Sequence, residues 1–186
     1  VDANRPYQQV LEEYTPGGVI KVSYVHGLDL ISQDRFGETG KSFYHVDGLG
    51  STRALSDALG IVTDQYIYDA YGQTIGQVGS TGNAYLFAGE QRDSTLGLDY
   101  LRARYMCPRV GRFLSVDPFA GVKSTPVTLH GYLYTGNNPI SRVDPGGEFF
   151  IIASVSAGLG IKSGIFNVQA SFAISGLRAI NRITKL

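Results

Sequence analysis

The chain has 186 residues, 43% of them hydrophobic, and carries no net charge, so it is long enough to bury a core. Zero net charge argues against generic nucleic-acid binding, which needs a basic surface to neutralise phosphates. The single cysteine, Cys107, excludes an internal disulfide, and neither a CxxC spacing nor a histidine ligand pattern indicates a metal site or a cofactor.

Residues 1–115 alternate between β-rich runs and glycine-centred turns, which predicts a mostly β fold of meandering antiparallel hairpins. In the run 61–72, Tyr66 and Tyr68 fall on one face while Gln65, Ile67 and Asp69 fall on the other. Strands are expected over 9–14, 19–27, 28–35, 41–46, 51–57, 61–72, 73–78 and 98–106.

A weak internal repeat runs through these hairpins. Tyr24, Tyr44 and Tyr66 recur at nearly equal spacing, and each is soon followed by a glycine turn. A period of about one hairpin is typical of repeat units that stack edge to edge. Coincidence in a chain rich in tyrosine and glycine is the alternative.

The pattern changes after residue 116. A short helix is predicted near 126–134, ended by the stretch Gly-Asn-Asn-Pro at 136–139. Residues 149–186 contain four basic residues and no acidic one, whereas all 16 acidic residues precede them, so we place a boundary at 148/149. An apolar stripe predicts a helical tail over 162–184.

Two Asp-Pro pairs, Asp117-Pro118 and Asp144-Pro145, are the most chemically suggestive feature. Two carboxyl groups held close together share a proton, as in the aspartic-protease dyad, and can activate water for peptide hydrolysis. A scissile bond in the same chain would need no binding step. Without further context, aspartate before proline is more often a turn residue whose side chain caps nearby N–H groups.

Three stretches of the chain resemble a known family. They are "YHVDGLGSTRALSDALGIVTDQYIYDAYGQ", "YLFAGEQRDSTLGLDYLRARYMCPRVGRFLSVDP" and "YLYTGNNPISRVDPGG". In this order and spacing they resemble the RHS-repeat-associated core, which closes the shell of RHS/YD-repeat proteins of the polymorphic-toxin type.

The resemblance implies a domain order and a function. Residues 1–40 would be YD-repeat strands, 41–148 the shell-closing core, and 149–186 a variable C-terminal extension held inside the shell. Implied partners are this C-terminal segment as cargo, the upstream YD-repeat shell of the same parent chain, and a secretion system or an immunity protein, with no nucleic acid. The parent would be secreted or at the cell surface. No signal peptide is visible, and we expect the chain to be a fragment of a longer protein.

The resemblance also implies an intramolecular aspartyl protease that needs no cofactor. Asp117 and Asp144 match the two motif aspartates, and Arg142 or Arg112 would be the supporting cation. The resemblance implies a cut just after the five-residue DPxGL motif, so the expected cleavage region is Gly147, Glu148 and Phe149.

Two positions differ from the family pattern. The family motif DPxGL reads DPGGE here, with Glu148 in the fifth position, and the usual RYYDP reads RYMCP. The two retained aspartates favour a self-cleaving core. Glu148 favours the alternative, a non-cleaving structural or adhesive YD-repeat surface module.

Overall fold

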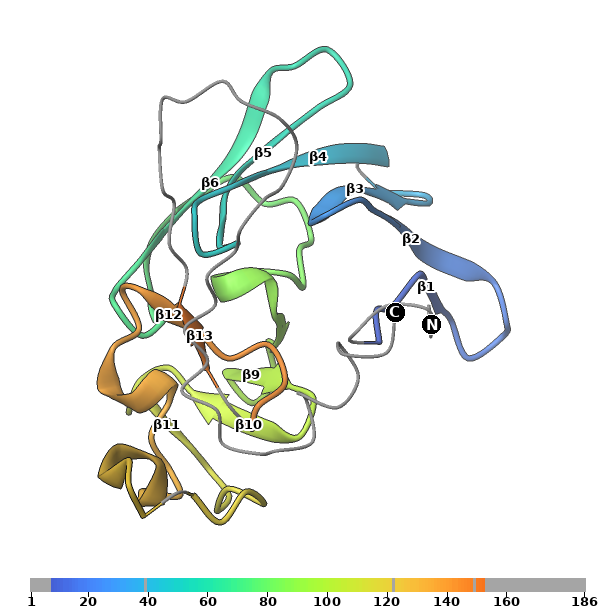
Figure 1. Ribbon diagram of the computed structural model, residues 1–186. Helices are drawn as coiled ribbons and strands as arrows, with labels where there is room; N and C mark the ends of the chain where they lie inside the picture. Colours follow the sequence, from blue (N-terminus) through green and yellow to red (C-terminus); the bar gives the residue numbers. More distant parts are fainter. Residues whose placement is uncertain (1–7, 39, 122, 149, 153–186) are drawn as a thin grey trace, which may run out of the picture.

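The computed structural model describes residues 8–38, 40–121, 123–148 and 150–152 (Figure 1). Over these residues the chain is built from antiparallel strands and short 3-10 turns, without an α-helix. Within the same residues no helix has the length and apolar character needed to cross a membrane. The predicted helical tail over 162–184 lies outside the described residues.

A seven-stranded antiparallel sheet contains the first part of the chain, and its strands are paired in sequence order. It forms the upper half of Figure 1, coloured from blue to green. Its strands are β1 (Glu12–Tyr14), β2 (Ile20–His26), β3 (Leu30–Arg35), β4 (Gly40–Val46), β5 (Thr52–Ser56), β6 (Val62–Tyr68) and β7 (Thr74–Val78). The predicted meander of hairpins is confirmed. The sheet continues through residue 40, where a domain boundary was expected.

One turn design recurs along this sheet. In the segments 47–50, 57–60 and 69–72 an aspartate is followed three residues later by a glycine with φ between 82° and 88°. The aspartate Oδ1 accepts two backbone N–H groups of its own turn each time. Glycine adopts this left-handed conformation without a Cβ penalty, so the local sequence selects the turn.

The predicted tyrosine repeat forms the core of the sheet. Tyr24, Tyr44 and Tyr66 lie on β2, β4 and β6, and all three side chains are buried. Along β6 the burial alternates, with Tyr66 and Tyr68 inside and Gln65 and Ile67 exposed. Side chains of a strand alternate between its faces, so the predicted division of these residues between two faces is confirmed, and the face with the tyrosines is the buried one.

A second sheet of four short strands follows, shown in yellow-green in the lower half of Figure 1. Its strands are β8 (Gln91–Asp93), β9 (Leu98–Leu101), β10 (Arg104–Cys107) and β11 (Arg112–Phe113), and a separate pair is formed by β12 (Arg142–Val143) and β13 (Ile151–Ile152). The 3-10 turns are η1 (Phe87–Gly89), η2 (Pro126–Leu129) and η3 (Thr135–Asn137).

Two sequence predictions are corrected here. The run 98–106 was predicted as one strand, but it is a hairpin that reverses at Arg102 and Ala103, with Arg102 at φ 55°. Arg102 and Arg104 therefore do not share a strand face. The helix predicted near 126–134 is only the single 3-10 turn η2, because the chain is already extended again at His130.

Candidate functional site

Asp117 and Asp144 meet at the side chain of Arg104. The Arg104 Nη2 atom lies 2.7 Å from Asp117 Oδ2 and 3.7 Å from Asp144 Oδ2. The Arg104 and Asp144 side chains are 2% and 3% exposed, and the Asp117 side chain is 14% exposed. Two carboxyl groups 27 residues apart in the sequence are therefore held on one buried cation.

Arg104 is placed by the alternation of β10. Arg104 and Met106 point inward while Tyr105 is exposed. The guanidinium lies over the ring of Phe113, 3.6 Å from its centre, and donates to the carbonyl of Gly131 at 3.2 Å. Burial lowers the pKa of Arg104, while Asp117 and Asp144 act in the opposite direction. A planar guanidinium with several donors suits a site that must hold two carboxyl groups and backbone carbonyls together.

Asp144 is buried within its own turn. Its Oδ1 atom accepts the backbone N–H of Gly147 at 2.8 Å and that of Glu148 at 3.2 Å. Burial raises the pKa of Asp144 to about 7, and Arg104 and the two N–H groups act against that rise. Asp144 can therefore hold a proton near neutral pH, as a general acid must.

The peptide bond between Gly147 and Glu148 is held from both sides. Its carbonyl oxygen accepts a hydrogen bond from Arg104 Nε, and its N–H donates to Asp144 Oδ1. Gly147 has a φ of 71°, and a Cβ at this position would lie 2.2 Å from the carbonyl oxygen of Leu101. Only glycine fits this close approach.

Asp117 is fixed by the turn that it begins. Its Oδ1 accepts the N–H of Phe119 at 2.9 Å, and its own N–H donates to the carbonyl of Gly131 at 2.7 Å. A cavity of about 30 Å³ is bordered by Arg104, Asp117, Asp144 and Glu148, among other residues. This volume is sufficient for one or two water molecules, and the lining supplies their polar partners.

The other residues of the predicted site lie around this centre. Arg142 is over the ring of Phe150, at 4.5 Å, and its Nη1 lies 3.5 Å from the carbonyl oxygen of Thr135. Arg112 is exposed, with its Nη1 3.4 Å from His130 Nε2. Among the ion pairs of the described residues, neither arginine joins Asp117 or Asp144. Phe149 lies outside the described residues.

Sequence reasoning missed Arg104 as the cation between the two aspartates. It named Arg142 or Arg112 as the supporting cation and placed residue 104 within one continuous strand over 98–106. The available signal was period two over 104–107, which places Arg104 on the same face as the buried Met106. A buried arginine requires an acidic partner, and the two Asp-Pro carboxylates were already candidates.

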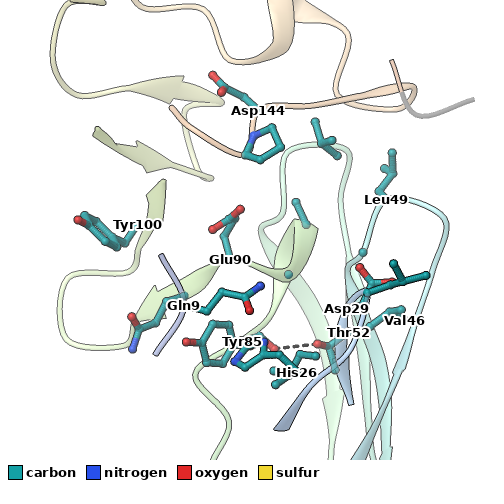
Figure 2. A pocket seen from close by; sticks show the side chains of 18 of the residues that line it. Gln9, His26, Asp29, Val46, Leu49, Thr52, Tyr85, Glu90, Tyr100 and Asp144 are labelled. Carbon is teal, nitrogen blue, oxygen red and sulfur yellow. Dashed lines mark hydrogen bonds between the residues drawn. The ribbon is translucent and has the colours of Figure 1, made fainter. Parts of the chain in front are cut away.

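A larger cavity, of about 570 Å³, lies on the other side of the 143–145 segment. Figure 2 shows Glu90 pointing into it, with Asp144 across the cavity and its carboxyl group directed away from Glu90. Burial raises the pKa of Glu90 to about 7, with Arg102 acting against the rise. Asp144 therefore lines both cavities. The described residues contain no cluster of three side chains suited to hold a metal ion.

Comparisons with known proteins give clear relatives, although no family model matches the chain. The chain is 38% identical over 158 residues, or 83% of its length, to "tRNA(Glu)-specific nuclease WapA" of Bacillus subtilis subsp. natto. It is 31% identical over 65% of its length to "Toxin protein Tse5" of Pseudomonas aeruginosa. Among solved structures, 68% of the chain matches the crystal structure of TcdB2-TccC3-Cdc42 with a TM-score of 0.58 and 26% identity. These matches cover only 7%, 9% and 6% of the respective proteins.

Proposed function

Since the chain belongs to the RHS/YD-repeat family of shell-type toxin proteins, we propose that it closes the β-sheet shell of a longer protein. The seven-stranded sheet supports this role, because its hairpins add edge to edge and β1 leaves an edge on which upstream strands can continue. In this proposal residues 1–40 belong to the repeat strands, 41–148 form the core, and 149–186 lead into variable cargo. The parent protein would act outside the cell or at its surface.

The partners in this proposal come mainly from the parent chain itself. The core would enclose the segment that follows residue 148 and join the upstream shell. The change from an acidic to a basic composition at 149 supports a functional boundary there. The external partner in this proposal is a secretion system or an immunity protein.

The core would also cut its own chain at the Gly147–Glu148 bond, one bond before the cut after the fifth motif residue that the resemblance implies. The observation that carries this proposal is the position of that peptide bond, between Arg104 at its carbonyl oxygen and Asp144 at its nitrogen. Asp117, beside the small cavity, would act as the base that activates water.

The reaction is a hydrolysis. The water oxygen attacks the carbonyl carbon of Gly147 while Asp117 accepts a water proton, and Arg104 stabilises the negative charge that develops on the carbonyl oxygen. The bond to nitrogen then breaks as Asp144 gives its proton to the departing nitrogen of Glu148. The products are a carboxyl group on Gly147 and a new amino terminus on Glu148, and the water is consumed.

The second candidate function is a structural or adhesive surface module that does not cleave. Glu148 favours it, because its carboxylate stands where the family motif has leucine, beside a site that must accumulate negative charge. Glu148 is exposed to solvent and also borders the small cavity.

The test is the intact mass of the expressed chain over time, beside Asp117→Asn and Asp144→Asn variants. Cleavage at 147/148 in the wild type and a loss of about 100-fold or more in rate in each variant would support the protease. Asp34→Asn, on β3 and away from the site, is the matched control and should cleave normally. A wild-type chain that stays whole would remove the protease proposal and leave the structural module.

A further inference from the structure

The turn between β9 and β10 binds the DPGG segment through successive contacts. Residues 102–104 donate to the carbonyl oxygens of residues 145–147, in the same order along both segments. The contacts are Arg102 Nη1 to Pro145, Ala103 N to Gly146 at 3.3 Å, and Arg104 Nε to Gly147. A one-residue slip of the DPGG segment would break all three hydrogen bonds, so this arrangement fixes which peptide bond faces Arg104.

Arg102, which makes the first of these contacts, with the carbonyl of Pro145, lines the larger cavity. Its Nη1 lies 2.9 Å from Glu90 Oε1 and 2.8 Å from Glu90 Oε2, in addition to its contact with Pro145. Glu90 is 8% exposed. A carboxylate is costly to bury, so the pair needs its hydrogen bonds to persist at this position.

Glu90 in turn is tied to the seven-stranded sheet. It directly follows η1, whose Ala88 N–H donates to Ser51 Oγ at 2.9 Å. One residue further along the chain, at the start of β5, the Thr52 hydroxyl donates to the carbonyl of Tyr85 at 2.8 Å, an interaction drawn in Figure 2. A continuous series of contacts therefore leads from β5, through Glu90 and Arg102, to the carbonyl of Pro145.

We propose that Arg102 and Glu90 are positioning residues that hold the DPGG segment in register, so that the Gly147–Glu148 bond is the one presented to Asp117 and Asp144. The inference rests on the self-cleavage proposed above. Neither side chain touches the reacting atoms. Their role is to hold the DPGG segment at a fixed position relative to the seven-stranded sheet.

The first experiment measures the cleavage rate and the cleaved bond in the full chain by intact mass. Arg102→Gln should slow cleavage by about tenfold or more and produce ends at more than one bond, because a charge-assisted hydrogen bond to the segment is lost. Arg102→Lys should recover part of the rate, because the contacts described above all come from one nitrogen and an ammonium group can supply them. Glu90→Gln should slow cleavage less than Arg102→Gln does. Arg53→Gln, which removes the surface pair with Asp47, is the matched control and should leave both rate and bond unchanged.

The second experiment does not depend on cleavage. Hydrogen exchange of the Gly147 amide, held by Asp144, should be about tenfold faster in Arg102→Gln, while amides of β2 to β6 exchange as in the wild type. A wild-type chain that is never cut would remove the self-cleavage proposal, and this exchange measurement would then decide the positioning role. Arg102→Gln with wild-type exchange at Gly147, or with a wild-type rate and a single cut, overturns the inference. A loss of rate that merely follows loss of folded protein also overturns it.

Discussion

Replacing Asp144 with asparagine tests the protonation of the site through the stability of the fold. Burial raises the pKa of this carboxyl from its ordinary value of 3.8 to about 7. The folded chain therefore binds the proton more tightly than the unfolded chain does. The resulting stabilisation is fully present below about pH 4 and is lost as the pH rises through about 7. One pKa unit corresponds to about 1.4 kcal/mol, so this proton accounts for up to about 4 kcal/mol between these limits.

Asparagine keeps an acceptor for the N–H groups of Gly147 and Glu148 but has no proton to lose. Between about pH 4.5 and pH 8 the free energy of unfolding should therefore fall by about 2–4 kcal/mol less in the asparagine chain. The remaining pH dependence is expected from Glu90 and Asp99, because burial raises their pKa values to about 7 and about 6.

Urea unfolding at several pH values, followed by tyrosine fluorescence, measures this difference, since the chain has 12 tyrosines and no tryptophan. Both chains would carry Asp117→Asn, so that cleavage does not alter them during the measurement. If the two chains lose the same free energy over this pH range, Asp144 does not hold a proton near neutral pH. The assignment of Asp144 as the acid would then be refuted.

Two further substitutions test the close contacts of the fold. Gly147→Ala should stop cleavage and destabilise the chain by more than Gly60→Ala does, as measured by intact mass and thermal unfolding. Both glycines have positive φ, which costs about 1–2 kcal/mol for alanine, but only at Gly147 does the new Cβ meet a backbone oxygen, that of Leu101. Equal losses in the two variants would contradict the reasoning. Leu55→Ala should cost about 2–5 kcal/mol in urea unfolding, because this side chain is fully buried on β5, whereas the exposed Leu59→Ala should change little.

The sheet could be predicted from the sequence because its rules are local. Period-two alternation placed Tyr66 and Tyr68 together on one face, which the structure shows to be the buried one, and the spacing of Tyr24 and Tyr44 matched the pairing of successive hairpins. Three of the turns carry their own aspartate and glycine, so the information needed for those hairpins lies within about 10 residues. These hairpins can therefore be predicted without knowing any contact between distant segments.

The site was less accessible to the same reasoning, because its contacts join distant segments. Arg104 meets Asp117 and Asp144 only after β9 reverses into β10, and that reversal occurs at a non-glycine residue, Arg102, with positive φ. The sequence signal for a turn is weak there, since arginine rarely adopts this conformation. Because a continuous strand was predicted in its place, the sequence analysis found neither the contacts of residues 102–104 with residues 145–147 nor the identity of the buried cation.

The proposed cut lies after every residue of the site. Asp117, Asp144 and Arg104 all precede the Gly147–Glu148 bond, so hydrolysis would remove none of them from the folded chain. Every pairing of the seven-stranded and four-stranded sheets also lies before that bond, and the cut separates only β13 from β12 by breaking the chain between them. Because the bond is held in place by the fold itself, the proposed reaction would need no binding step. Such a core would cut once and then remain a folded shell element, holding the released segment only through noncovalent contacts.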